Sequence, residues 1–351
     1  IRRGSRTPRT AMHIPDGYLS PATAGALYAA MLPFWMAAAR KLKRLLSGKT
    51  IPLMALLSAF CFVIQMINIP LPGGTTGHAV GAGIAAIVLS PWPAVLTLSI
   101  TLVIQALFFG DGGITAIGAN CFNMALVQVF SSYAIYRLLS AKAQSPRGKA
   151  IAAGVAGYIG INLAALCAGI ELGLQPSIAH SPDGTPLYAP YPLNIAVPAM
   201  MTGHLIAGFA EGVLSAAAVY YLSAQAPEFF DTVRSLPDQT PLPVFWRRLR
   251  TIWMVLALAV FITPLGLLAP GTAWGEWSAD QLREKGLGFV PSGLKSIENL
   301  WPALFRDYQI PGFGANTGYI FSAVIGILLI SLIFWLLTLA GRRAALRTSK
   351  P

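Results

Sequence analysis

Residues 316–341, NTGYIFSAVIGILLISLIFWLLTLAG, contain no Asp, Glu, Lys, Arg or His. At about 1.5 Å per helical residue, a run of this length can cross the hydrocarbon core of a bilayer, which is about 30 Å thick. The whole chain has a similar character, because 55% of its 351 residues are hydrophobic and only 11% are charged. Soluble domains carry about 25% charged residues. The sequence therefore predicts an all-α polytopic membrane protein.

Apolar segments recur along the chain and give an expected total of about nine. They lie at 22–45, 51–69, 78–90, 92–109, 114–139, 148–172, 195–222, 251–268 and 316–341. The third is short and ends at Ser90-Pro91-Trp92-Pro93, where two prolines must break a helix. We expect 78–90 either to span fully, or to be re-entrant or form a helical hairpin with the next segment.

The basic residues predict how these segments are oriented. With nine crossings, most of the 25 Lys and Arg residues fall in linkers that share one side: 40–50, 137–149, 223–250 and the tail 342–351. Cytoplasmic loops of membrane proteins are enriched in Lys and Arg. We therefore expect the C-terminus inside, and the N-terminal residues 12–21, Gly73–His78 and Gly173–Asn194 outside. The net charge of +12 comes from such clusters and not from one basic face that would bind nucleic acid.

The first eleven residues, IRRGSRTPRTA, depart from this charge pattern, because they contain Arg residues although the topology places them outside. They lack the apolar core of a signal peptide, and Met12 follows them directly. We expect residues 1–11 to be an upstream extension or a removed segment, with the working chain starting at Met12. The alternative is an ordinary disordered tail.

Two of the four histidines, His13 and His78, lie at the expected outer mouth of the helices. If Met12 is the first residue, its amine, the amide nitrogen of His13 and the His13 imidazole can close two adjacent chelate rings around one divalent ion. His78, which follows Gly73-Gly74-Thr75-Thr76-Gly77, is the candidate for the fourth corner. Four nitrogens in a tetragonal array suit Ni(II) or Cu(II), with Co(II) as a related candidate, and suit calcium or magnesium poorly.

His204 and Glu211 lie two helical turns apart on one face of segment 195–222. Ionisable groups inside a membrane are costly and are therefore functional candidates. His204 is expected either to support the metal ligands from behind or to make a polar packing contact between helices. Glu211 is a second candidate for such a supporting role.

Several catalytic motifs are absent from the sequence. It contains no GxxxxGK[ST] of P-loop ATPases, no HExxH and no GxSxG. We therefore expect a protein that is not an enzyme, and any ATP-driven transport would need separate ATPases.

MHIPDGYLSP at 12–21, followed by PLPGGTTGHAVG at 70–81, resembles the CbiM/NikM family. These proteins are the substrate-binding S components of nickel/cobalt energy-coupling factor (ECF) transporters. The resemblance covers about 12–225 and includes Asp111-Gly112-Gly113 and Gly118-Ala119-Asn120.

The family's metal ligands are the initiator Met amine, the next His and a His of the glycine-rich loop, which correspond here to Met12, His13 and His78. The resemblance implies a capture subunit for nickel or cobalt ions in a prokaryotic plasma membrane. It also implies one integral membrane coupling (T) subunit and two cytoplasmic ATPase subunits as partners, besides the membrane lipid.

Residues 251–351 resemble, less closely, the small accessory (N) component of these systems, which has two membrane helices joined by an outer loop. Here the helices would be 251–268 and 316–341, the outer loop 269–315, and 226–250 a basic cytoplasmic linker. Pro291-Ser292-Gly293-Leu294-Lys295 keeps part of the Pro-Asp-Gly-Leu-Glu signature of that component.

Two other functions stay open on the residues alone. One is a stand-alone secondary metal transporter driven by protons, with Glu211 and His204 as the proton relay. The other is a membrane zinc enzyme or sensor, with His13, His78 and His204 in a tetrahedral site.

Overall fold

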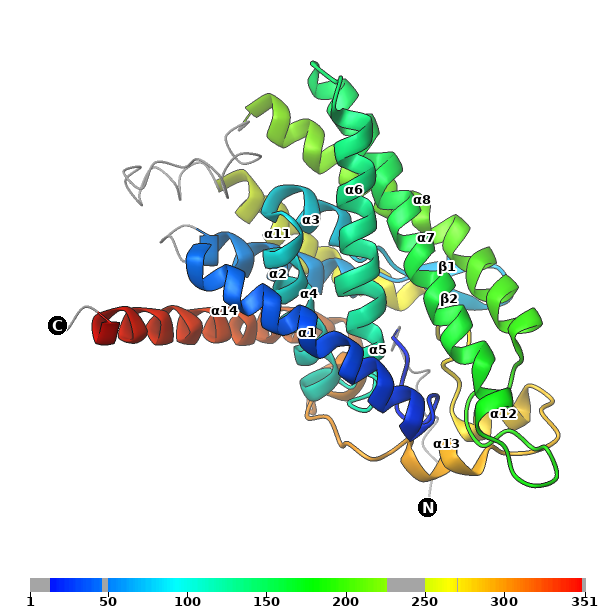
Figure 1. Cartoon of the computed structure of the whole chain (residues 1–351). Coiled ribbons are helices and arrows are strands. Elements are labelled where there is room, and N and C mark those ends of the chain that lie inside the picture. The colour runs from blue at the N-terminus through cyan, green and yellow to red at the C-terminus, as the bar shows by residue number, and fades with distance from the viewer. Residues whose placement is uncertain (1–12, 46–49, 226–249, 270, 349–351) are drawn as a thin grey trace.

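The computed structural model describes residues 13–45, 50–225, 250–269 and 271–348 (Figure 1). These residues are mostly helical. The α-helices are α1 (Pro21–Leu45), α2 (Thr50–Gln65), α3 (Ala82–Leu89), α4 (Pro91–Ile104), α5 (Ile117–Asn120), α6 (Val129–Ser140), α7 (Pro146–Ile178), α8 (Leu193–Gln225), α11 (Arg250–Ile262), α12 (Ala279–Glu284), α13 (Ser292–Ile297) and α14 (Ala315–Thr348).

Shorter elements complete the architecture. Two π-helical stretches, η1 (Gln105–Phe109) and η2 (Cys121–Gln128), continue α4 and join α5 to α6, and two 3₁₀ turns, η4 (Thr263–Leu268) and η5 (Arg306–Tyr308), lie in the C-terminal third. Strands β1 (Ile69–Leu71) and β2 (Thr75–Gly77) pair antiparallel, with Pro70 opposite Thr76. The strands are a small addition to the all-α architecture that hydropathy predicts.

Six helices among the described residues are long and apolar enough to cross a membrane. They are Pro21–Leu42, Pro91–Phe109, Pro146–Ile178, Leu193–Gln225, Arg250–Leu268 and Ala315–Ala340. The expected segment 51–69 contains α2, which has only 16 residues, and the expected segment 114–139 is the continuous run from α5 to α6. The multi-helix membrane architecture is thus confirmed, whereas the total of nine crossings stays a prediction.

Segment 78–90 forms a hairpin with the next helix, one of the predicted alternatives. Its helix α3 has eight residues, about 12 Å of helix, which is too short to cross a bilayer alone. Ser90 adopts a left-handed φ of 69°, and α4 starts at Pro91, where a proline is well tolerated because the first turn needs no donor. Every residue of α3 is buried.

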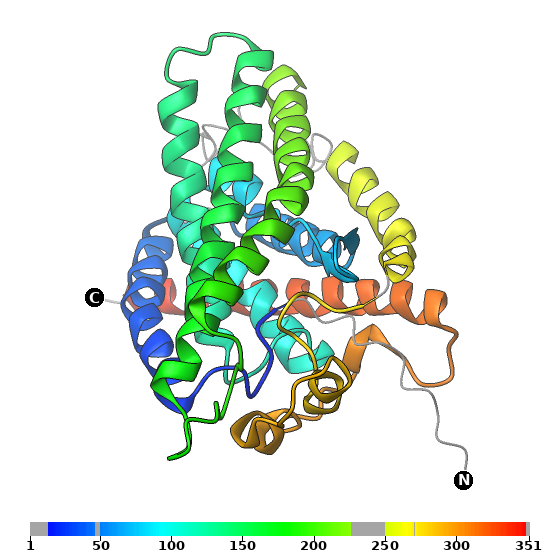
Figure 2. The same cartoon turned by 90° about the vertical axis from the view of Figure 1, so that its right-hand side faces the viewer.

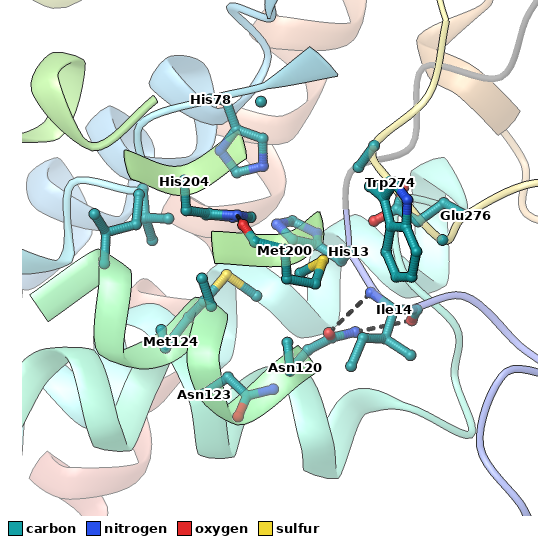
Figure 3. Close-up of a pocket in the computed structure, with 18 of the residues that line it drawn as sticks. His13, Ile14, His78, Asn120, Asn123, Met124, Met200, His204, Trp274 and Glu276 are labelled. Atoms are coloured by element: carbon teal, nitrogen blue, oxygen red, sulfur yellow. Dashed lines mark hydrogen bonds between the residues drawn. The ribbon is translucent and has the colours of Figure 1, made fainter. Parts of the chain in front are cut away.

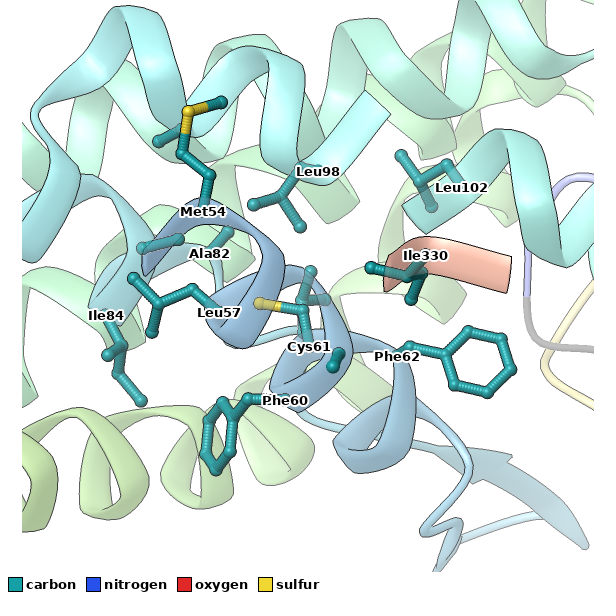
Figure 4. Packing of buried hydrophobic residues seen from close by; sticks show 14 of the residues in the cluster. Met54, Leu57, Phe60, Cys61, Phe62, Ala82, Ile84, Leu98, Leu102 and Ile330 are labelled. Carbon is teal, nitrogen blue, oxygen red and sulfur yellow. The ribbon is translucent and has the colours of Figure 1, made fainter. Parts of the chain in front are cut away.

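The hydrophobic core surrounds α2, α3, α4 and α14 (Figure 4). Phe62 of α2 is fully buried and packs on Phe109 with ring centroids 5.2 Å apart. Gly326 lets α14 pack closely against Phe62, because a Cβ at this position would lie 2.2 Å from the Phe62 ring. The C-terminal helix is therefore part of the same packed body as the N-terminal helices.

Two groups of connections lie at opposite ends of the helices. In Figure 1 the loop between α7 and α8, together with α12 and α13, lies at the lower right. The last turns of α1 and α14 lie toward the left, and the last turns of α8 lie toward the top. In Figure 2 the N-terminal segment before α1 runs close to α12 and α13 at the bottom of the molecule.

Candidate metal site

A cavity of about 70 Å³ lies where the N-terminal segment, the β2–α3 connection, η2, α7 and α8 meet the segment 273–276 (Figure 3). Its polar and sulfur-bearing lining consists of His13, Thr76, His78, Asn120, Asn123, Met124, Gln128, Met200, His204, Trp274 and Glu276. One cavity therefore collects three of the four histidines of the chain.

The structure brings His13 and His78 together. Their ring centroids are 5.3 Å apart at an interplanar angle of 88°, and only 3% and 7% of the two residues is exposed. The two residues are 65 positions apart in the sequence. Apart from the family resemblance, no sequence pattern predicts that they lie together. Met12, the third expected ligand, lies outside the described residues.

The ring nitrogens of the two histidines have different partners. Nδ1 of His78 lies 2.9 Å from the carbonyl oxygen of Ala79, so Nδ1–H donates and the lone pair of Nε2 stays available for a metal. Nδ1 of His13 lies 3.2 Å from Oδ1 of Asp111. A chelate ring with the amide nitrogen of His13 must use this same Nδ1, so a chelated ion would replace the contact with Asp111.

Charge distinguishes the two rings further. Burial lowers the pKa of His13, but the charge and hydrogen-bonding capacity of Asp111 outweigh it and raise that pKa above 6.5. For His78, burial and the neighbouring His13 lower the pKa to about 4. His78 is therefore neutral over the physiological range and able to coordinate, whereas Asp111 favours the protonated form of His13.

Asn120 fixes the N-terminal segment over the cavity. Its Oδ1 accepts from the Ile14 amide and its Nδ2 donates to the Ile14 carbonyl, both at 3.1 Å (Figure 3, dashed lines). The amide of Gly113 donates to the same carbonyl at 3.0 Å. A Cβ at Gly113 would lie 2.2 Å from the backbone nitrogen of Asp16, so only glycine lets the two segments lie this close.

Asp111 is itself held by a residue of the C-terminal third. The hydroxyl of Tyr308 donates to Oδ2 of Asp111 at 2.6 Å, and Nε2 of Gln105 donates to the Tyr308 hydroxyl at 3.4 Å. Tyr308 is 1% exposed, and its ring stacks on that of Phe109 with the ring centroids 5.0 Å apart. A buried chain of contacts thus runs from Tyr308 through Asp111 to His13.

Glu211 contacts the backbone that follows His78. Its carboxylate accepts from the amides of Val80 (2.8 Å), Gly81 (2.9 Å) and Gly83 (3.2 Å) at the start of α3. These are amides that a helix N-terminus leaves without intrahelical partners. Glu211 is 0% exposed, and it anchors the turn that carries His78.

His204 lines the cavity itself. Its Nδ1 lies 2.9 Å from the carbonyl oxygen of Met200, one turn earlier in α8, so Nδ1–H donates there and Nε2 carries the lone pair. Within the described ranges, no three His, Cys, Asp or Glu side chains lie close enough together to hold a metal ion. The tetrahedral zinc site of His13, His78 and His204 is therefore not formed.

The expected outer loop 269–315 packs against the N-terminal segment. The Tyr18 hydroxyl donates to the Trp277 carbonyl oxygen, and a Cβ on Gly17, whose φ is +87°, would lie 2.7 Å from the Leu294 oxygen. Glu276 of this loop lines the cavity and is 7% exposed. Burial, with the charge of Asp111 adding to it, raises the pKa of Glu276 well above its usual range.

Sequence reasoning missed four residues of this site: Asp111, Asn120, Tyr308 and Glu276. Asp111 and Asn120 belong to short glycine-containing motifs that the family resemblance includes, but their role is visible only in three dimensions. Tyr308 and Glu276 do not belong to such motifs. Each lies in the C-terminal third of the chain and reaches the site only through tertiary packing.

Residues 13–229 match the family model for the cobalt uptake substrate-specific transmembrane region, CbiM. The chain belongs to this family. Residues 249–343 match a second model, the PDGLE domain, so a CbiM region is followed by an accessory-type region in one chain.

Among the relatives of this CbiM-family chain is the fused nickel transport protein NikMN of Rhodobacter capsulatus. The two are 47% identical over 337 residues, which cover 91% of this chain and 95% of the relative. The probable fused nickel transport protein LarMN of Lactiplantibacillus plantarum is 44% identical over 330 residues, which cover 92% of this chain and 96% of the relative. A crystal structure described as a truncated transition metal transporter is 52% identical with a TM-score of 0.57, covering 61% of this chain and 99% of the other. Together with the six candidate spans, these relatives identify an integral membrane protein of a nickel/cobalt transport family.

Proposed function

We propose that this chain is the substrate-capture subunit of an ATP-driven ECF importer for nickel or cobalt ions. The observation that carries the proposal is the pair His13–His78, two imidazoles 5.3 Å apart in one buried cavity. The relatives named as nickel transport proteins align along nearly the whole chain, which supports a transported ion as the ligand.

The proposed ligands are the amine of Met12, the amide and imidazole nitrogens of His13, and Nε2 of His78. Two points of geometry support this set. Nε2 of His78 is left available by the contact of Nδ1 with Ala79, and Asn120 holds Ile14, the residue next to His13. Both Ni(II) and Co(II) accept nitrogen ligands of this kind. The integral membrane T subunit and two ATPases would move the captured ion into the cell.

The proposed orientation places the cavity at the outer face of a prokaryotic plasma membrane and the C-terminus inside. It is supported by the clustering of Lys and Arg in linkers between helices. The helix ends that adjoin these linkers lie toward one side of Figure 1, opposite α12 and α13. Residues 1–11, proposed to be absent from the working chain, and most of the linker 226–250 lie outside the described residues.

The proposed organisation has two working parts: the S component at 12–225, and the accessory region at 251–351 with its outer loop 269–315. It is supported by two successive family matches, over 13–229 and 249–343. Residues of the accessory region, Tyr308 and Glu276, lie at the cavity of the first part.

The test is metal uptake in cells that produce the chain with its T subunit and ATPases. Separate substitutions His13→Ala and His78→Ala should each abolish Ni²⁺ or Co²⁺ accumulation. His180→Ala is the matched control, since His180 is exposed in the α7–α8 loop and its Nδ1 contacts the adjacent Ser181. Undiminished uptake in both site variants would refute the proposal, and uptake by the chain alone in liposomes under a proton gradient would favour a secondary transporter instead.

A further inference from the structure

The C-terminal region contributes a carboxylate to the metal cavity. Glu276 lies beside Trp274 on the side of the cavity formed by segment 273–276 (Figure 3). Its side chain is more than nine-tenths buried, since the residue is 7% exposed, and its Oε2 has no hydrogen-bond partner within the described part of the chain. A buried carboxylate oxygen without a partner is costly, so this atom points to a ligand that the cavity receives.

The charge around the cavity is suited to a cation. Asp111 contacts His13, which lines the cavity, and its charge acts on Glu276. None of the described lining residues is Lys or Arg. Because buried carboxylates are normally paired with cations or bound to metals, the partnerless Glu276 oxygen favours occupation of the cavity by a divalent ion.

The dimensions of the cavity indicate how Glu276 would meet such an ion. Glu276 does not form a three-residue metal cluster with His13 and His78 in the described structure, so it is not placed as a direct ligand beside both rings. The cavity, with a volume of about 70 Å³, is several times larger than the roughly 10–15 Å³ that one water molecule needs. It therefore has room for an ion that still carries water.

We propose that Glu276 binds the incoming transition-metal ion through the water molecules that the ion carries. Each metal-bound water donates a hydrogen bond to the carboxylate, and the charge of the carboxylate continues to balance that of the ion after the nitrogens of the capture site have replaced this water. The accessory region thereby takes a direct part in ion capture. This inference rests on the proposed function, because it assumes that the cavity binds nickel or cobalt.

The test uses the full chain, purified in detergent, and Ni²⁺ as the probe. Glu276→Gln keeps the shape of the side chain and removes its charge, Glu276→Asp keeps the charge, and Glu284→Gln is a matched control on an exposed glutamate of the same loop. We expect Glu276→Gln to weaken Ni²⁺ binding about 10- to 100-fold, Glu276→Asp to recover part of the loss, and Glu284→Gln to bind as the unsubstituted chain does. The visible absorption of the bound Ni²⁺ should be the same in all variants, since the nitrogen ligands do not change.

Two results would overturn the role of Glu276. One is unchanged Ni²⁺ affinity in Glu276→Gln. The other is a loss of affinity that Glu276→Asp does not recover and that accompanies a lower unfolding temperature, which would mark Glu276 as a packing residue. Failure of the proposed function would look different: the unsubstituted chain would not bind Ni²⁺, or His13→Ala would bind it normally.

Discussion

The hydroxyl of Tyr308 lies 2.6 Å from Oδ2 of Asp111, although the two residues are 197 positions apart. The other oxygen of the same carboxylate, Oδ1, lies 3.2 Å from Nδ1 of His13. The accessory region therefore reaches a proposed metal ligand of the CbiM region through one shared carboxylate. Because a chelated ion would use Nδ1 of His13, Asp111 and the ion compete for this nitrogen, and Tyr308 influences how strongly Asp111 competes.

Tyr308→Phe tests this relationship. The substitution removes the donor to Asp111 and keeps the ring that stacks on Phe109. Without this donor the carboxylate holds the competing proton of His13 more firmly, so we expect Ni²⁺ affinity near neutral pH to fall by up to about tenfold. Isothermal titration of Ni²⁺ into Tyr308→Phe, Asp111→Asn and the double variant should give non-additive changes, because Tyr308→Phe should have no further effect once Asp111 is replaced. Strictly additive changes would mean that Tyr308 does not act through Asp111.

The pH dependence of binding should shift in Asp111→Asn. A proton on His13 competes with the metal, and Asp111 raises the pKa of His13 above 6.5, so binding to the unsubstituted chain should weaken as the pH falls through that raised pKa. With Asn at 111, burial lowers the pKa of His13 and only the weaker contribution of Gln65 opposes it. The loss of binding should then occur at a lower pH. Ni²⁺ titrations between about pH 5 and pH 8 would show this shift, and identical midpoints would contradict it.

Asn120→Ala should release the N-terminal segment. The substitution removes both side-chain hydrogen bonds to Ile14, and leaving a buried backbone group without a partner costs about 1–3 kcal/mol. Ni²⁺ affinity should fall accordingly, by about tenfold or more. Asn194→Ala, at an exposed position near the start of α8, is the control. Limited proteolysis of the N-terminal segment gives a second measurement, and wild-type protection in Asn120→Ala would argue against this anchoring role.

Glu211→Gln should loosen the turn that carries His78. The new amide group would face backbone donors at the start of α3, where the carboxylate accepts three hydrogen bonds. We expect a loss of about 1–3 kcal/mol in unfolding free energy together with weaker metal binding. Glu171→Gln is a matched comparison, because Glu171 is also buried in a membrane helix and its carboxylate accepts a hydrogen bond from the Asn123 side chain instead of from backbone amides at the start of α3. Equal thermal stability of Glu211→Gln and the unsubstituted chain in detergent would contradict this role.

The sequence predicts a membrane protein of several helices, because uncharged stretches such as 316–341 have few alternatives to a bilayer, but the expected total of nine crossings stays a prediction beside the six candidate spans of the described residues. It also predicts that 78–90 is unusual, since Pro91 and Pro93 interrupt any helix there. It does not decide between a full span and a hairpin, which depends on the buried surroundings of α3.

The candidate site is predictable only in part. His13 and His78 belong to recognisable motifs, and the structure places them in one cavity. Glu211 stands out as an ionisable residue in an apolar segment, but its partners are backbone amides, which leave no trace in sequence spacing. Tyr308 and Glu276 reach the site through the tertiary packing of a distant loop, and no local pattern predicts such contacts.

The most direct test of the proposed metal site compares Ni²⁺ binding by two forms of the chain, one beginning at Met12 and one that keeps residues 1–11. If the α-amino group of Met12 is a ligand, the form beginning at Met12 should bind Ni²⁺ at least about 100-fold more tightly, with visible absorption typical of a four-nitrogen square plane. Intact mass would verify each N-terminus. Equal affinity and an identical spectrum for the two forms would contradict the proposed metal site.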